Sequence, residues 1–283
     1  MATPPTELAA RIEAHAHPAW LYRYPVFLRI IFGWYRLLYQ RTWATQCALR
    51  RELSALPPGA VVFDAGCGEG LFLFRTARAF PTLQFIGGDL RTANLRLATA
   101  YLARTGLKNV ELQQADLLDP ATLPTAHLIY SVGVLHLLAD DAAALRHLRA
   151  ACAPGGTLLL YTPVHRRRVL PWFEGWYRRF ANYEATHAQR RYTPQRLRRV
   201  FAAAGWTITD ERYTNGTLGI IGYELYTGSF LLLSAGRGWQ RLAGGLLLVL
   251  TLPLVLLLNA LDYVRRPARG NGVLLTARIL SAE

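Results

Sequence analysis

A glycine-rich turn between an apolar run and a helical pattern constrains this chain more than any other feature. Residues 60–63 form an apolar run typical of a buried strand in a parallel sheet. The run stops at Asp64, and residues 71–80 beyond the turn have the pattern of a helix. Three glycines lie between them at alternate positions: Gly66, Gly68 and Gly70. Strand, glycine turn and helix predict the start of a doubly wound α/β domain, whose ligands bind beyond the carboxyl ends of the strands.

The spacing of the turn, Gly-x-Gly-x-Gly, differs from the Gly-x-Gly-x-x-Gly of dinucleotide sites. The acid before it, Asp64, would repel a pyrophosphate but suits a ligand that carries an ammonium group. In the form Asp-Ala-Gly-Cys-Gly-Glu-Gly, the turn resembles the first motif of the class I S-adenosylmethionine-dependent methyltransferases. A structural glycine turn, or the site of another Rossmann-like cofactor, is the alternative. The resemblance implies S-adenosylmethionine as cofactor, bound in part by these residues of the motif: Asp64, Gly66, Cys67, Gly68 and Gly70.

A second acid follows the next strand. Residues 83–89 read as that strand, and Asp89 lies about 20 residues beyond the turn, where an acid that binds both ribose hydroxyls is expected. A carboxylate at a strand end has no evident structural role, which favours the functional one. We expect Leu90 to lie against the face of the adenine.

A third acid ends the third strand, residues 109–115. In the resembled family, the acid at the place of Asp116 accepts a hydrogen bond from the adenine amino group. The backbone N–H of the next residue, here Leu117, donates to the ring. An aspartate at the start of a loop is otherwise common turn chemistry.

Four further strands complete the predicted sheet: residues 127–132, 157–161, 206–212 and 272–280. The resemblance covers residues 60–163 and resumes at Tyr192, and it implies that the last strand is antiparallel. The predicted fold is a doubly wound, seven-stranded Rossmann-like sheet of the α/β class. It has a helical N-terminal extension, residues 1–57, and a methyltransferase domain, residues 58–283. Two insertions are predicted within that domain, at 164–191 and 213–271, and the second is hydrophobic and helical.

The chain is strongly basic, with a formal net charge of +14 that is almost entirely arginine. A basic surface favours nucleic acid, an anionic membrane or an acidic substrate without choosing among them. The 3 cysteines have neither metal-binding spacing nor an even disulfide framework, which suits a reducing cytoplasm. Residues 1–17 are polar, so we expect no secretory signal there. No metal is predicted, and no pattern indicates an oligomeric state.

Two segments interleave aromatic residues with arginines. The first, residues 20–41, is interpreted either as a helix packed over the open side of the cofactor cleft or as an interfacial helix at lipid headgroup depth. The second is the insertion at 164–191, which includes Arg166, Arg167 and Arg168. It follows the fifth strand, so it should cover the substrate side of the cleft, or else form a solvated cap.

An apolar run from Leu242 to Leu258 is long enough to approach a membrane span. A single crossing would, however, separate the sixth strand from the seventh. The run is therefore predicted to be a buried helix, a re-entrant hairpin with Phe230 to Leu233 as its other arm, or an interfacial helix. Arginines flank the run on both sides, which suits contact with headgroups. We expect peripheral attachment to the inner, cytoplasmic face of a membrane; a single-span anchor stays open only if the last strand is misassigned.

Methyl transfer from a sulfonium requires positioning and exclusion of water, and a hydroxyl acceptor also requires a base. His136 follows the fourth strand and titrates in the useful range, although the resembled family often has a histidine there without a catalytic role. The Asn/Asp-Pro-Pro-Tyr motif of base-methylating relatives is replaced by residues 131–134, which disfavours nucleic acid. The sequence thus predicts methylation of an oxygen or carbon of a small, lipophilic, membrane-associated acceptor. The alternatives are a nucleic-acid methyltransferase and a non-catalytic protein that binds S-adenosylmethionine.

Overall fold

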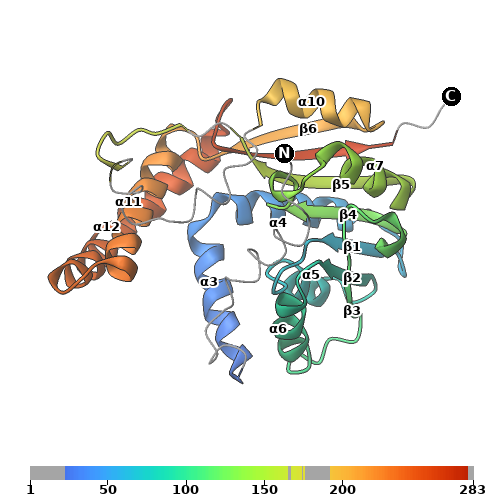
Figure 1. The fold of residues 1–283 in the computed structure, drawn as a ribbon, viewed down its shortest axis with the longest axis horizontal. Coiled ribbons are helices and arrows are strands. Elements are labelled where there is room, and N and C mark those ends of the chain that lie inside the picture. Colours follow the sequence, from blue (N-terminus) through green and yellow to red (C-terminus); the bar gives the residue numbers. More distant parts are fainter. Residues whose placement is uncertain (1–22, 165–166, 174, 176–191, 280–283) are drawn as a thin grey trace.

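A seven-stranded sheet forms the centre of the computed structural model, which describes residues 23–164, 167–173, 175 and 192–279 (Figure 1). The strand order is β3-β2-β1-β4-β5-β7-β6, and β7 runs antiparallel to both of its neighbours. The predicted fold, including the antiparallel last strand, is confirmed. The strands are β1 (Val61–Ala65), β2 (Gln84–Asp89), β3 (Val110–Gln114), β4 (Ala126–Val132), β5 (Cys152–Pro163), β6 (Thr207–Thr214) and β7 (Gly272–Arg278).

Helices cover both faces of this sheet (Figure 1). One face packs against α4 (Gln40–Leu53), α5 (Leu73–Ala79) and α6 (Thr92–Leu102), and the other against α7 (Asp141–Ala151) and α10 (Pro194–Ala203). Successive residues of β1 show why both faces must be covered: Val62 points to the first set of helices and Phe63 to the second, and both side chains are fully buried. Short 3-10 helices, η1 (Pro25–Phe27), η2 (Pro120–Thr122) and η3 (Leu135–Leu137), complete the connections.

The fifth strand starts earlier than the sequence pattern predicts. It begins at Cys152, which pairs with Ala126, and the register then shifts before Leu128 pairs with Thr157. Gly155, with a φ of 71°, lies within this irregularity. The five residues before the predicted start at 157 thus belong to the strand as well, and glycine at 155 tolerates the positive φ of the irregular stretch.

Helices α11 (Thr217–Ala235) and α12 (Trp239–Arg265) form a hairpin between β6 and β7. Figure 1 shows them side by side, projecting from the sheet near α3 (Leu28–Leu38). Both ends of the hairpin return to the same edge because Thr214 pairs with Gly272. The predicted apolar run lies in α12, and Phe230 to Leu233 lies in its partner arm, as the hairpin alternative required.

Helix α12 is the one helix among the described residues that is long and apolar enough to cross a membrane. Only 17% of its most apolar window is buried in the protein, so the expectation of a buried core helix is wrong. The single-span alternative depended on a misassigned last strand. Since β7 lies in the sheet as predicted, that condition does not hold.

A buried polar cluster fixes the base of the hairpin to the start of α4. The carboxylate of Asp262 accepts hydrogen bonds from the Gly216 N–H at 2.8 Å and from Gln40 Nε2 at 3.2 Å. Gln40 Oε1 in turn accepts from the Asn215 N–H at 2.8 Å. Asn259 Nδ2 donates to the last carbonyl of α3 at 2.9 Å. These side chains are buried, so each bond replaces water that the groups have lost.

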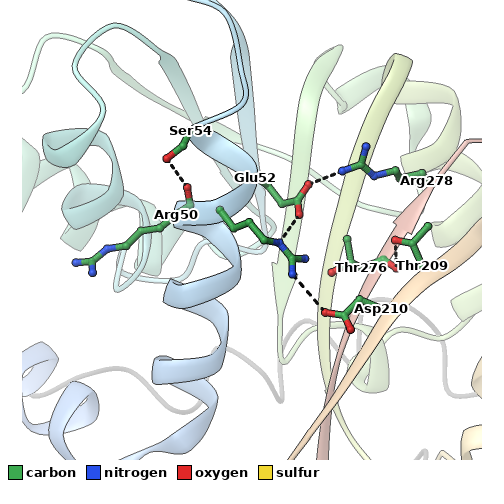
Figure 2. Close-up of polar contacts among 8 residues, drawn as sticks. Arg50, Glu52, Ser54, Thr209, Asp210, Thr276 and Arg278 are labelled. Carbon is green, nitrogen blue, oxygen red and sulfur yellow. Dashed lines mark hydrogen bonds and ion pairs between the residues drawn. The ribbon is translucent and has the colours of Figure 1, made fainter.

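Ion pairs connect the other end of α4 to β6 and β7 (Figure 2). Glu52 lies between two arginines and accepts from Arg278 Nη2 at 2.8 Å and from Arg51 Nε at 2.9 Å. Arg51 also lies 3.7 Å from Asp210 on β6. A hollow of about 540 Å³ opens beside these residues, where β7 ends and β6 begins. It is at the edge of the sheet opposite to the predicted cofactor site.

Replacement of Asp262 by Ala should destabilise the protein, because it leaves the Gly216 N–H buried without its acceptor and removes one of the acceptors of Gln40 Nε2, which keeps its bonds to Asn259. Each donor left unpaired costs about 1–3 kcal/mol. Urea unfolding of the variant measures the loss in the free energy of unfolding. Glu111→Ala, at an exposed position of β3, is the control and should change stability by no more than about 0.5 kcal/mol. Equal stability of both variants would show that the cluster does not hold the hairpin.

Candidate functional site

Three acids mark the carboxyl edge of three neighbouring strands. Asp64 lies near the end of β1, Asp89 ends β2, and Asp116 follows β3. Because β1, β2 and β3 are parallel and adjacent, the acids lie along one edge of the sheet. The strand order reverses between β1 and β4, which is where doubly wound sheets bind their ligands. The predicted site residues are thus brought together at one place.

The glycine turn is tied to the end of β2 by its backbone. The amides of Gly66 and Cys67 both donate to the Gly88 carbonyl, at 2.8 Å and 2.9 Å. Gly66 has a φ of 89°, and a Cβ on it would lie within 2.3 Å of Val134 Cγ2. The loop after β4 therefore packs directly on the turn, and only glycine fits between them.

Gly68 presents an open stretch of backbone. Its φ is 54°, and nothing lies within 4 Å of the place that a Cβ would take. A ligand can thus approach this residue closely. Two other residues of the predicted cofactor motif face the protein interior instead. Gly70 packs against the ring of Phe74, and Cys67 is buried. Burial raises the pKa of the Cys67 thiol, so this side chain acts in packing rather than as a nucleophile.

The carboxylate of Asp89 is hydrogen-bonded to the glycine turn. Its Oδ2 accepts from the Gly68 N–H at 2.8 Å, and its Oδ1 accepts from the Arg91 N–H at 2.9 Å and Asn94 Nδ2 at 3.2 Å. The expectation that this carboxylate has no structural role is therefore wrong. Burial raises its pKa, and these three hydrogen bonds oppose the rise. A carboxylate has about four acceptor positions, so one remains for a ribose hydroxyl.

Asp64 is the acid with the most perturbed surroundings. It is 2% exposed, and burial raises its pKa to about 8. The Tyr130 hydroxyl opposes this rise, and the charge of Asp89 adds to it. Neither Asp64 Oδ2 nor the Tyr130 hydroxyl makes a hydrogen bond of good geometry to the described part of the chain. A buried carboxylate oxygen without a partner fits the ammonium group of S-adenosylmethionine, which would supply the missing bond.

The predicted adenine side is more open. Leu90 is 45% exposed, and Asp116 is half-buried. Asp116 Oδ1 accepts from the Leu118 N–H at 2.9 Å, so it also has the turn role that was the alternative interpretation. The Leu117 side chain is buried, which leaves its backbone as the group that can contact a ring. Binding of adenine by Asp116 and Leu117 stays a prediction.

His136 lies in η3, on the loop that packs against the glycine turn through Val134. Its side chain is half-buried. The residue is thus two positions along the chain from the contact between this loop and the glycine turn. Its role as a base stays a prediction.

Two groups on the acceptor side were not assigned from the sequence. Arg41 was part of the aromatic and arginine segment, but nothing in its pattern marked it as a site residue. Ser131 Oγ donates to the Ala65 carbonyl at 2.7 Å and joins the ends of β4 and β1. Both depend on contacts between distant segments, which a pattern along the chain does not show.

Part of the predicted cover is described. Glu224 of α11 accepts hydrogen bonds from the Val169 and Leu170 amides, the latter at 2.7 Å. Asn271 Oδ1 accepts from the Arg167 N–H at 2.9 Å. The segment after β5 is thus fastened to the base of the hairpin. Arg166 and residues 176–191 of the predicted insertion lie outside the described residues.

A family model described as a methyltransferase domain matches residues 38–211, more than half of the chain. The chain belongs to the class I S-adenosylmethionine-dependent methyltransferase family. The enzyme is 33% identical over 140 residues to a trans-aconitate 2-methyltransferase of Variovorax paradoxus, a match that covers 48% of this chain and 52% of the relative. The enzyme spans about half or less of the length of its curated relatives.

Solved structures show the same fold at low identity. The [4+2]-cyclase SpnF superposes with a TM-score of 0.57 at 18% identity, over 84% of the enzyme and 81% of the cyclase. A geranyl diphosphate methyltransferase, in complex with GPP and sinefungin, superposes with a TM-score of 0.55 at 14% identity, over 84% and 78% of the two chains. The fold and the cofactor class predicted from the glycine turn are confirmed.

Replacement of Asp89 by Ala should weaken cofactor binding, because it removes a charged acceptor and releases the Gly68 amide. A hydrogen bond to a charged group is worth about 1.5–3 kcal/mol, so affinity for S-adenosylhomocysteine should fall by about 10- to 150-fold. Calorimetric titration measures this. Asp119→Ala removes an acid near the same edge, one that caps only Ala121, and should bind like the wild type. Wild-type affinity in the Asp89 variant would overturn its assignment to the cofactor site.

The pKa of Asp64 should appear in the pH dependence of stability. Its ordinary value is 3.8 and its value in the folded, ligand-free protein is about 8. Between these two values the folded protein holds a proton that the unfolded chain has lost, so stability falls as the pH rises. The loss is at most about 1.4 kcal/mol per pH unit. Urea unfolding from pH 5 to 8 should show this decline in the wild type relative to Asp64→Asn; parallel curves would contradict the raised pKa.

Proposed function

We propose that the enzyme transfers a methyl group to an oxygen or carbon of a small, lipophilic acceptor at the cytoplasmic face of a membrane. The observation that carries the proposal is the exposed apolar stripe of α12. S-adenosylmethionine supplies a methyl group activated by its sulfonium. The protein then has to bind the acceptor, orient it and exclude water.

The stripe consists of apolar side chains, each at least 40% exposed, that recur every three or four residues along one side of α12. Its members are Leu242, Leu246, Val249, Leu250, Leu254, Leu257, Leu261 and Val264. Exposed Ile30 and Leu37 on the neighbouring helix α3 add apolar surface. An apolar surface of this length on one helix is typical of a membrane or protein contact.

The charges around the stripe favour a helix lying in the membrane interface over a hairpin inserted tip first. Arg237 and Arg241 are at the tip, near the turn between the two helices. Arg265, Arg266 and Arg269 are at the base. A tip carrying arginines would have to cross the hydrocarbon, which costs several kcal/mol per charge. If the hairpin lies flat, the arginines at both of its ends contact headgroups. Each arginine near anionic lipid then adds roughly 1 kcal/mol to the free energy of membrane binding.

The acceptor class rests on two supports. The relatives include enzymes named for small-molecule acceptors, trans-aconitate and, for a lipophilic one, geranyl diphosphate. The segment that begins at β5 and is bound by Glu224 joins the cover of the acceptor side to the hairpin. His136 is the candidate base if the acceptor atom is a hydroxyl oxygen.

The test is transfer of radiolabelled methyl groups from S-adenosylmethionine to vesicles made from the lipids of the source organism. The wild type should float with the vesicles and label one lipid species. Replacement of Leu246, Val249 and Leu250 together by Asp should abolish flotation and strongly reduce labelling, with cofactor affinity unchanged. The control carries Met at the same three positions and should behave as the wild type. Absence of a labelled lipid, or flotation of the Asp variant, would overturn the proposal.

A further inference from the structure

Arg41 lies in the first turn of α4, where the carboxyl ends of β4 and β5 meet. Its Nη1 is 3.9 Å from the place that a Cβ on Gly133 would take. Its charge also acts on Tyr161 of β5: burial raises the pKa of that hydroxyl, and Arg41 opposes the rise. The guanidinium is therefore next to both strand ends that border the acceptor side of the cleft.

This position is close to the cofactor turn. Gly133 precedes Val134, and Val134 packs directly on Gly66. A group held by Arg41 would thus be separated from the glycine turn by little more than this loop. That distance suits a part of the acceptor, because the acceptor must reach the methyl group from this side.

Within the described residues, Arg41 has no carboxylate partner. Its guanidinium carbon lies 5.2 Å from the centre of the Tyr39 ring, and it forms no ion pair with an acid in the described part of the chain. Arg41 Nε is buried and has no hydrogen-bond acceptor among the residues that the structure describes. Buried donors in proteins normally have partners, and guanidinium has five N–H groups arranged to bind a carboxylate or phosphate.

The position of Arg41 at the amino end of α4 also favours an anion beside it. The first turn of this helix contains no acid, and its amino end carries partial positive charge, so a cation there is unfavourable without an anion beside it. The buried hydroxyls of Thr42 and Thr45, on the same part of the helix, also lack hydrogen-bond partners among the described residues.

Rings continue from Arg41 towards the exposed apolar surface. The rings of Tyr39 and Tyr226 pack edge to face, with 6.1 Å between their centroids. The rings of Tyr226 and Phe230 are stacked, with 6.0 Å between their centroids. Phe230, on α11, is 44% exposed. The charge of Arg41 is thus at one end of an aromatic row whose other end is on the hairpin. An amphiphile, with one anionic end and one apolar end, matches this arrangement.

We propose that Arg41 binds an anionic group, a carboxylate or a phosphate, of the amphiphilic acceptor and so determines acceptor specificity. The inference rests on the proposed function, since it names the chemistry of the same acceptor. It adds that a neutral lipophile of equal length is a poor acceptor. Arg41 orients the acceptor by its charged end and takes no part in the transfer itself.

Water-soluble probes test this without a membrane. The ligands are decanoate, decyl phosphate and decanol, and their affinities for the protein saturated with S-adenosylhomocysteine are measured by calorimetry. At least one anion should bind the wild type about 10- to 100-fold more tightly than decanol, the range of one or two charged hydrogen bonds. The preferred anion distinguishes a carboxylate acceptor from a phosphate acceptor. Arg41→Gln should reduce the preference to less than about threefold, and Arg41→Lys should retain part of it.

The matched control is Arg50→Gln, on the same helix but exposed, which should keep the wild-type preference. Every variant should bind S-adenosylhomocysteine as the wild type does, which separates a local effect from misfolding. Equal affinity of the wild type for all three probes, binding of none, or an unchanged preference in Arg41→Gln overturns the inference. Because no vesicle is present, failure of membrane attachment would leave this result unaffected.

Discussion

The pairing of β7 with both β5 and β6 is the constraint on which the acceptor side of this enzyme depends. It brings Thr214 and Gly272 together, so everything between them must leave the sheet and return to one point. A helical hairpin satisfies this while most of its backbone groups bond inside its own two helices. The buried carboxylate of Asp262 then fixes the direction in which the hairpin leaves, because it binds the first amide before α11 and the side chain of Gln40.

Helix α4 connects the two edges of the sheet and has a different chemistry at each end. At the amino edge, Glu52 balances Arg51 and Arg278, and the charges there are satisfied within the protein. At the carboxyl edge, Arg41 has no such acid among the described residues. The same helix thus contains one arginine, Arg51, that is paired within the protein and another, Arg41, that has no acid beside it among the described residues. The contrast between its ends, rather than the total charge of +14, indicates where recognition takes place.

Much of the cofactor half was predictable because parallel strands repeat a simple rule. Asp64, Asp89 and Asp116 each stand at or just beyond a strand end, and strand ends meet at one edge, so the strand pattern together with the family resemblance grouped them. Connectivity argued against a single membrane crossing, since two strands of one sheet cannot lie on opposite sides of a membrane, but it left the hairpin as one of three alternatives. The bonds from Asp89 to the turn and the contact of Gly70 with Phe74 were not predictable, because they depend on how loops fold back. Arg41 was missed because its importance comes from Gly133 and Tyr161, which are distant in sequence.

The position of the hairpin before β7 in the chain has a consequence for folding during synthesis. Until β7 has been made, β5 has an unpaired edge and β6 has no neighbour to pair with. The apolar stripe of α12 emerges from the ribosome during this interval. A nascent chain therefore exposes an unpaired sheet edge and an apolar helix at the same time. Both features promote aggregation. Early shielding of the stripe, by a membrane or a chaperone, would protect the chain until its last strand closes the sheet.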